Sequence, residues 1–149
     1  MASNDLRTIG YSVRISANKP CPCHSGRKAK SCCLPILKGQ IPVAPSALMR
    51  SRYTAYAIGA VQYILNTTHP DGPHYRQNTG QWLAEVQAFS SAMSFDGLVI
   101  HKSHEDGSEA SVYFSATLSQ NGQDRSFSEN SRFIRRNGRW LYHSALAQQ

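Results

Sequence analysis

All four cysteines of this chain lie within one short stretch that could hold a metal ion. The stretch has the sequence CPCHSGRKAKSCC, with Cys21 and Cys23 as one pair and Cys32 and Cys33 as the other. A tetrahedral site of four thiolates around Zn²⁺ needs its sulfur atoms delivered by two short, tightly turned segments. The spacing therefore predicts one zinc ion bound by the four cysteines in a closed, structural site.

Other uses of these cysteines are weaker hypotheses. The adjacent Cys32 and Cys33 could pair only through a strained vicinal disulfide, and disulfide frameworks belong to secreted chains. The first twenty residues lack the apolar core of a signal peptide, so we expect a cytosolic protein. Redox-active thiols remain an alternative. His24 is a further candidate ligand, but four sulfur atoms already complete a tetrahedron, and we favour a solvated loop residue there.

Positive charge is concentrated in the same part of the chain. Residues 1–40 carry seven lysines or arginines against one aspartate, whereas the net charge of the whole chain is +7. Arg27, Lys28 and Lys30 lie between the two cysteine pairs. Such a surplus attracts acidic partners, although runs of charge are often only a solvated face. We expect an acidic protein surface as the partner; nucleic acid is a weaker candidate because no aromatic residues interleave with the basic run.

The remaining residues predict helices first and strands afterwards. We divide the chain into an extended arm (1–18), a zinc module (19–38), a proline-rich connector (39–45) and an α+β domain (46–149), with no apolar run long enough to span a membrane. Helices are predicted from Pro45–Ser46 to Gly59, with Ser46 as N-cap, over 60–67, and from an Asn78 or Thr79 cap through Val86. Glycine turns separate four antiparallel strands, over 95–104, 110–119, 125–135 and 139–146.

The cysteine stretch resembles the SEC-C motif, a zinc-binding module best known from the C-terminus of the translocation ATPase SecA. The motif has the pattern Cys-x-Cys-x-Ser-Gly, a basic stretch, and a cysteine followed by Cys or His. The resemblance implies that Cys21, Cys23, Cys32 and Cys33 are the metal ligands. His24 stands where glycine is usual, and Ala29 where an aromatic residue is common. Because the module of SecA contacts a chaperone and anionic surfaces, a role near protein export or ribosomes follows by analogy.

The later part of the chain resembles the nuclear-transport-factor-2-like cone fold. Its stretches ALMRSRYTAYAIGAVQYILNTTHP, ENSRF and NGRWLYH are similar to those of the YchJ-type proteins, which join a SEC-C motif to such a domain. The resemblance implies an α+β cone of helices packed on a curved antiparallel sheet, together with metal binding. It also suggests a homodimer through the open sheet face, since cone-fold relatives often dimerise there. It implies no particular activity.

A pocket between helices and sheet is common in the cone fold, and several residues could line it. The candidates are Arg50, Arg52, Tyr53, His69, Trp82, Glu129, Ser131, Tyr142 and His143. A buried carboxylate beside histidine and tyrosine could act as a general base. The simpler interpretation is that Glu129 pairs with Arg50 or Arg52 and fastens the first helix to the sheet. We favour this structural role over catalysis, because no nucleophile and base occur at a recognisable spacing.

These observations combine into one leading hypothesis. We expect a zinc-binding adaptor whose basic SEC-C-like module docks an acidic partner. The alternative is an enzyme or small-ligand binder that uses the pocket around Glu129. We also expect removal of the metal to disorder the module while the α+β domain, which has its own core, stays folded.

Overall fold

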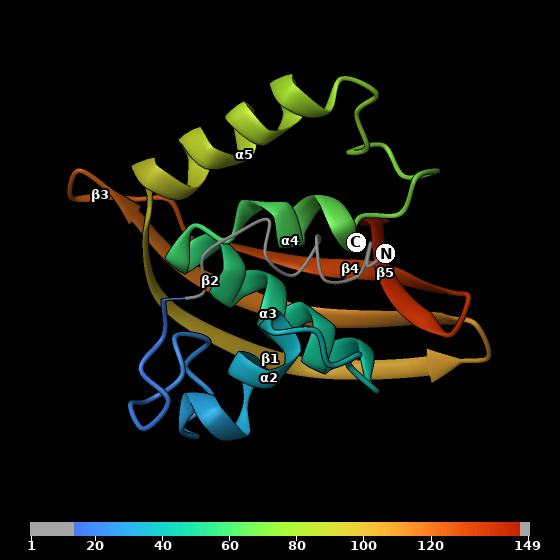
Figure 1. Cartoon of the computed structure of the whole chain (residues 1–149), viewed down its shortest axis with the longest axis horizontal. Helices are drawn as coiled ribbons and strands as arrows, with labels where there is room; N and C mark the ends of the chain where they lie inside the picture. Colours follow the sequence, from blue (N-terminus) through green and yellow to red (C-terminus); the bar gives the residue numbers. More distant parts are fainter. Residues whose placement is uncertain (1–13, 147–149) are drawn as a thin grey trace.

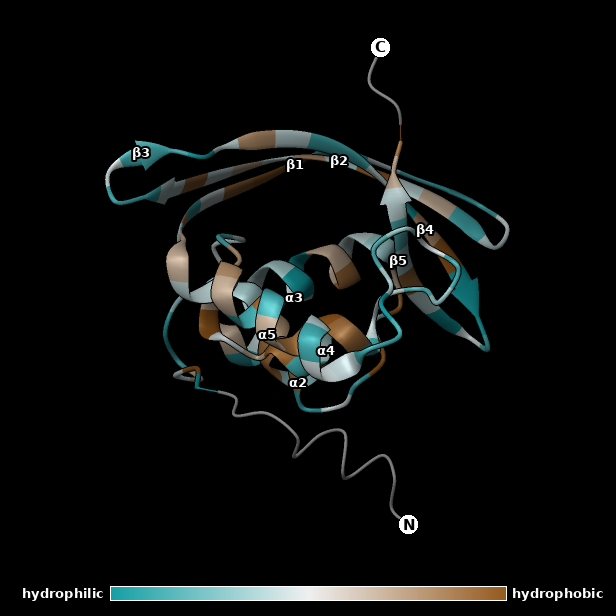
Figure 2. Ribbon diagram, turned by 90° about the horizontal axis from the view of Figure 1, so that it is seen from above, coloured by the Kyte–Doolittle hydropathy of each residue, from teal (hydrophilic) through white to brown (hydrophobic). Residues whose placement is uncertain are grey.

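The structure, a computed structural model of the chain, describes residues 14–146. Most of the predicted extended arm, residues 1–13, therefore lies outside the described residues. A curved antiparallel sheet wraps around a group of helices, which lie on its concave side (Figure 2). The cysteine-containing segment lies beside helix α3, away from α5 (Figure 1). This α+β arrangement is the predicted cone fold, with a small N-terminal cysteine module.

The helices begin and end where the local sequence favours it. They are η1 (Ala29–Ser31), α2 (Cys33–Leu37), α3 (Pro45–Ile58), α4 (Val61–Asn66) and α5 (Thr79–Ala92). Helix α3 starts with Pro45, whose missing N–H is not needed in the first turn. It ends at Gly59, which takes the left-handed φ of 80° expected for a C-cap glycine. The predicted N-cap at Ser46 was wrong, because Ala44 occupies that position.

The cap of helix α5 follows the prediction. The side chain of Asn78 accepts a hydrogen bond of 3.0 Å from the backbone N–H of Gln81. This bond satisfies one of the backbone donors that a helix leaves free at its N-terminus. The cap fixes where α5 begins, and hence which of its side chains, Trp82 and Val86 among them, are buried.

The strands form the predicted meander. They are β1 (Ser94–Asp106), β2 (Glu109–Gln120), β3 (Gln123–Asp124), β4 (Phe127–Arg136) and β5 (Arg139–Ala145). The sheet has the order β1-β2-β4-β5, with the short β3 paired to β2. The register places Phe114 opposite Glu129 and Phe133 opposite Tyr142. Because side chains alternate between faces, these four residues all belong to the concave face that meets the helices.

The exposed edge of β5 is partly covered by the segment that follows α4. The backbone N–H of His69 donates to the oxygen of Tyr142, and the N–H of Tyr142 donates to the oxygen of Thr67, both at 2.8 Å. Gly72 continues this close approach, since a Cβ atom there would clash with the carbonyl oxygen of His143. The segment therefore holds helix α4 against the last strand.

The cysteine module and the cone share one hydrophobic core. Leu34 and Leu37 of α2 are buried together with Leu48 of α3, and the four cysteines belong to the same cluster. Helix α2 was not predicted from the sequence; its Pro35 falls within the first turn, where proline is tolerated. Over residues 14–146, no helix is long and apolar enough to cross a bilayer.

Candidate metal centre and adjoining cavity

The first cysteine pair lies on a tight reversal of the chain. The N–H of Cys21 donates to the oxygen of Arg27, and the N–H of Ala29 donates to the oxygen of Lys19, both at 2.9 Å. Two residues in the reversal take the left-handed region, His24 with φ 63° and Gly26 with φ 89°. Glycine adopts this conformation without steric cost. The conformation at His24 therefore explains why glycine is usual at this position in SEC-C motifs.

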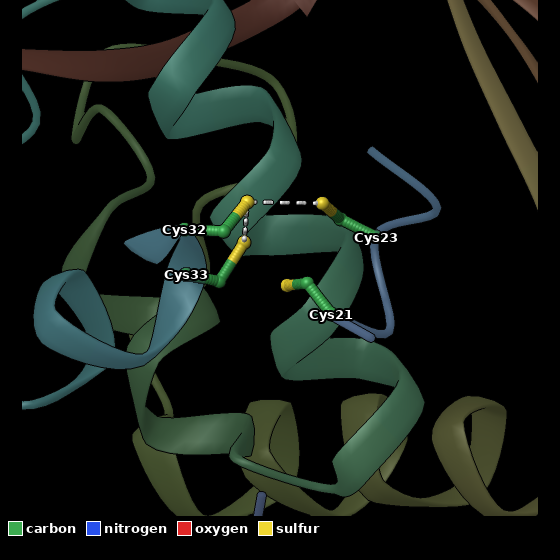
Figure 3. A group of neighbouring side chains, drawn as sticks. All are labelled: Cys21, Cys23, Cys32 and Cys33. Atoms are coloured by element: carbon green, nitrogen blue, oxygen red, sulfur yellow. Dashed lines mark hydrogen bonds between the residues drawn. The ribbon is translucent and has the colours of Figure 1, made fainter. Parts of the chain in front are cut away.

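The four sulfur atoms converge on one point beside helix α3 (Figure 3). All of them lie within 4.8 Å of one another. The Sγ atoms of Cys23 and Cys32 are 3.5 Å apart, and those of Cys32 and Cys33 are 3.9 Å apart. A tetrahedron of thiolates with metal–sulfur bonds of about 2.3 Å has sulfur–sulfur edges of about 3.8 Å. The spacing of these free cysteines thus fits a four-coordinate metal ion.

Mutual contact and burial shift the pKa values of Cys21 and Cys33 in opposite directions. Hydrogen bonds from the neighbouring thiols of Cys23 and Cys33 lower the pKa of Cys21 to about 3. The pKa of Cys33 is raised, because its proton is held in the bonds to Cys21 and Cys23 and burial disfavours a second thiolate. Deprotonation of all four requires a cation among them.

Four donors surround the sulfur atoms, and two of them come from helix α3. From the module itself, Ser25 Oγ lies 3.2 Å and Arg27 Nη2 lies 3.4 Å from Cys32 Sγ. From α3, Thr54 Oγ1 donates to Cys33 Sγ at 3.3 Å. Arg50 Nη1 donates to the carbonyl oxygen of Cys23 at 3.2 Å. These donors would offset the negative charge of metal-bound thiolates.

The contribution of helix α3 to the cysteine group was not predicted from the sequence. Arg50 was expected in the pocket, and Thr54 was given no role. The only local signal is their spacing of four residues, which places both side chains on one face of the helix. Nothing in that spacing says what the face meets.

His24 contacts the sheet and lies outside the group of sulfur atoms. Its Nε2 is 3.2 Å from the backbone oxygen of Phe95, and its ring centre is 5.8 Å from that of Tyr53. The residue thereby ties the cysteine reversal to the start of β1. The expected metal ligands are the four cysteines, and they are the members of the group that the structure brings together.

The three cations between the cysteine pairs lie on the surface. Arg27, Lys28 and Lys30 are exposed. Across residues 14–146 the salt bridges are Arg76–Glu85 and Arg132–Glu109, and neither involves the module. The sequence contains no aspartate or glutamate between Asp5 and Asp71. The module therefore presents its positive charge to solvent, with Arg27 also contacting Cys32.

A cavity of about 570 Å³ lies on the other side of α3, lined by residues of that helix, α5 and the concave face of the sheet. Most of its lining is aromatic or aliphatic. Among the predicted pocket residues, it is lined by Arg52, Tyr53, Trp82, Glu129, Ser131 and Tyr142. The predicted residues Arg50, His69 and His143 do not line it. Arg50 faces the cysteines instead.

His69 has a structural contact in place of the predicted pocket position. The residue is buried, and its Nδ1 accepts a 3.0 Å hydrogen bond from the backbone N–H of Asp71. Its ring centre lies 5.2 Å from that of His143. This arrangement closes the turn after α4.

Glu129 is half-buried, and its predicted ion pair with an arginine is absent from the described residues. Ser131 and Tyr142 both donate to the same oxygen of Glu129, Oε2, at 2.5 and 3.0 Å. Burial, together with the charge of Glu129, raises the pKa of Tyr142. The carboxylate is therefore held by two hydroxyl groups of the sheet.

Arg52 is buried and stabilises the end of α4. Its Nη1 donates to Thr67 Oγ1 at 2.8 Å and to the carbonyl oxygen of Ile64 at 3.2 Å. Its guanidinium carbon lies 4.7 Å from the ring centre of Tyr142, a cation–π distance. Carbonyl groups at a helix C-terminus are natural partners for a cation. The arginine thus fastens α3 to α4 and β5, and Tyr142 stands between it and Glu129.

Comparison with known proteins gives matches to two family models. Residues 44–145 match the description "YchJ, middle NTF2-like domain", and residues 18–35 match the SEC-C motif. A UPF0225 protein of Deinococcus radiodurans is 38% identical over 129 residues, which cover 85% of this chain and 88% of the relative. A UPF0225 protein of Chromobacterium violaceum is 35% identical over 139 residues, covering 87% and 94%.

Solved structures agree on the fold. A SEC-C motif containing protein from Rhodopseudomonas palustris, solved in solution, superposes with a TM-score of 0.74 at 31% identity, over 88% of this chain and 100% of that one. A crystal structure of a SEC-C motif containing protein from Psychrobacter arcticus superposes with a TM-score of 0.65 at 20% identity, over 89% and 86%. The second likeness shows the fold alone.

Proposed function

The chain belongs to the YchJ family, whose curated members are designated UPF0225, and from that premise we propose that it is a zinc-dependent adaptor protein. In this function Cys21, Cys23, Cys32 and Cys33 hold one Zn²⁺, and the surface formed by Arg27, Lys28 and Lys30 docks an acidic protein partner. Zn²⁺ supplies cross-linking of the two cysteine pairs and has no open position for chemistry.

The choice of zinc follows from the donor set. Four thiolates without an oxygen or nitrogen ligand are typical of structural zinc sites, which hold the fold and leave no room for substrate. The four cysteine residues are 0–8% exposed, so the ion would be shielded from solvent. A buried, four-sulfur centre fits a role in shaping a surface better than a role in catalysis.

The observation that carries the docking surface is the absence of acidic neighbours in the described part of the module. A zinc ion with four thiolates has a formal charge of about −2. Arg27 and Arg50 contact the cysteines and offset that charge. Lys28 and Lys30 are exposed and form no salt bridge with the described residues, and residues 14–70 contain no aspartate or glutamate. Their charge is available to an acidic partner.

The experiment is an affinity capture from cell extract with four forms of the full chain, the wild type and three variants. The first variant carries Lys28→Ala and Lys30→Ala, which leaves the Arg27 contact to Cys32 intact, and a second adds Arg27→Ala. The matched control removes three exposed cations from the sheet, Lys102→Ala, Arg136→Ala and Arg139→Ala. Metal content is measured for every form, so that loss of metal and loss of docking are separated.

We expect the wild type and the control to capture acidic proteins that neither module variant captures. The metal content of the double variant should equal that of the wild type. Capture should also weaken as salt is raised, because exposed charges are screened. Retention of every partner by the module variants would overturn the docking surface. Capture that disappears on nuclease treatment would replace the acidic protein by nucleic acid.

A small-ligand binder is the second candidate function. It is favoured by the cavity between α3, α5 and the sheet, which the adaptor function does not use.

A further inference from the structure

The cavity is too large to be a packing defect. Its volume of about 570 Å³ falls within the range of roughly 300–1,000 Å³ that small-molecule sites occupy. Protein interiors contain few voids larger than a water molecule. Nothing in the metal centre requires this space, because the cysteines contact a different face of α3. The cavity therefore has the size of a ligand site that is separate from the cysteine group.

The lining indicates a mainly apolar occupant. Aromatic rings surround the space from three sides: Tyr56 from α3, Trp82 and Phe89 from α5, and Phe114 from the sheet. Arg76 and Glu85 also line the cavity and are exposed, with side-chain exposures of 60% and 48%, so they mark its opening to solvent. A molecule with an apolar body can enter past this rim and contact the rings.

The polar groups of the cavity determine which hydrogen-bonding group a ligand needs. Ser131 and Tyr142 both use their hydroxyl protons on Glu129 Oε2. Glu129 Oε1 receives no hydrogen bond from the described residues, although the side chain lines the cavity. A carboxylate oxygen accepts hydrogen bonds and cannot donate them. A ligand that fits this end therefore brings an N–H or O–H donor.

The charges near this end compensate each other. The guanidinium group of Arg52 lies on the face of the Tyr142 ring, and the carboxylate of Glu129 accepts from its hydroxyl group. An anion would be opposed by Glu129, and a cation would be opposed by Arg52. The balance favours a ligand without net charge. We propose that the cavity binds an uncharged, mainly apolar small molecule whose single hydrogen-bond donor is accepted by Glu129 Oε1.

The test uses the probe N-phenyl-1-naphthylamine, an uncharged aromatic molecule with one N–H donor whose fluorescence rises in apolar surroundings. The full chain is titrated with this probe and with two relatives of it. 1-Benzylnaphthalene, used as a competitor, has the same shape but a CH₂ group in place of the N–H. 8-Anilinonaphthalene-1-sulfonate adds a negative charge. We expect saturable binding of the amine, with the hydrocarbon about tenfold weaker because it leaves Glu129 without its partner.

Matched variants place the binding in the cavity. Ala116 and Thr117 are neighbours on β2, and Ala116 is buried in the lining whereas Thr117 is exposed on the opposite face. Ala116→Trp is expected to weaken the amine at least tenfold by occupying the space, and Thr117→Trp is expected to leave it unchanged. Glu129→Gln replaces the accepting oxygen Oε1 with an NH₂ donor and should abolish the preference for the amine over the hydrocarbon. This variant tests the site even if Ala116→Trp folds poorly.

Three results would overturn the proposal. One is the absence of saturable binding up to the solubility of the amine. Another is binding that Ala116→Trp does not weaken in a folded protein. The third is tighter binding of the sulfonate than of the amine at the site that Ala116→Trp blocks, since that would make Arg52 the determinant and the ligand an anion. Because none of these results depends on docking through Lys28 and Lys30, the adaptor proposal is tested separately.

Discussion

Helix α3 carries two sites that are built in opposite ways. On one face, Arg50 and Thr54 contact cysteines whose sulfur atoms are packed at near van der Waals distance. On another face, Tyr53 and Tyr56 line a cavity of about 570 Å³. The four cysteines are closely packed, and the donors around them contact their sulfur atoms or backbone. The cavity is hollow, and at one end Glu129 Oε1 receives no hydrogen bond from the described residues. The first arrangement suits a structural ion, and the second suits an exchangeable ligand.

The contrast also concerns stability. The cysteines belong to the same core as α2 and α3, so the ion would hold elements that the cone needs. The cavity lining includes Glu129, whose removal from the hydrogen-bond network changes few packed contacts. Loss of the metal centre should therefore affect folding of the whole chain, whereas changes in the cavity should affect binding more than folding.

The largest effect is expected from Cys32→Ser. This change removes a ligand that contacts Cys23, Cys33, Ser25 and Arg27, and we expect loss of the metal together with roughly 4 kcal/mol or more of unfolding free energy. Thermal unfolding followed by circular dichroism, with and without a chelator, measures it. The neighbouring exposed Ser31→Ala is the control and should unfold like the wild type.

This expectation departs from the one based on sequence, in which the cone domain stays folded without metal. The shared core is the reason for the change. An unfolding temperature of the sheet that is the same with and without chelator would favour the original expectation and separate the two regions.

A smaller effect is expected from Arg52→Met. The change removes the donor to Ile64 and to the hydroxyl groups of Thr67 and Thr68, and it should cost about 2–3 kcal/mol of unfolding free energy. Glu129→Gln should cost less than about 1 kcal/mol, because the amide oxygen still accepts from Ser131 and Tyr142. Urea denaturation measures both. If Glu129→Gln lost as much unfolding free energy as Arg52→Met, and the losses were not additive in a variant with both changes, a direct arginine–glutamate pair would be supported instead.

Thr54→Val tests whether α3 supports the metal without being a ligand. Valine has the shape of threonine and lacks the hydroxyl group that donates to Cys33 Sγ. We expect metal affinity to fall about tenfold, measured by competition with a chromophoric chelator, and we expect Thr54→Ser to restore it. An unchanged affinity in Thr54→Val would show that the hydroxyl group only fills space.

The smallest effect is expected in alkaline solution. Burial raises the pKa of Tyr53 to about 12, compared with about 10 for an exposed tyrosine. The folded state binds this proton more tightly than the unfolded state, so the stabilisation is complete below pH 10 and is lost as the pH rises from 10 through 12. Unfolding free energies across this range measure the loss, and Tyr53→Phe should show a shallower decline. An equal decline in the variant would assign the effect to other groups.

The parts that could be predicted from sequence are those determined locally. Cys21, Cys23, Cys32 and Cys33 are close in the chain, and Asn121–Gly122 and Asn137–Gly138 favour tight turns wherever they occur. The row of apolar residues on β2 faces the helices as its alternation predicts.

The parts that could not be predicted depend on contacts between distant segments. Thr54 meets Cys33 across 21 residues, and Arg50 meets Cys23 across 27. The partner of Arg52 includes a backbone carbonyl group, which has no signature in the sequence. Charge complementarity suggested Glu129 as the partner of Arg52. The hydrogen bonds to the end of α4 pair the arginine at a lower desolvation cost than a buried ion pair would.

The most direct test of the central claim is the X-ray absorption spectrum of the full chain purified without chelators. The account predicts a zinc edge with about one equivalent of metal per chain and four sulfur neighbours at about 2.3 Å. A different metal edge, an oxygen or nitrogen neighbour in place of a sulfur, or less than about half an equivalent of metal would contradict the closed zinc centre on which the proposed adaptor depends.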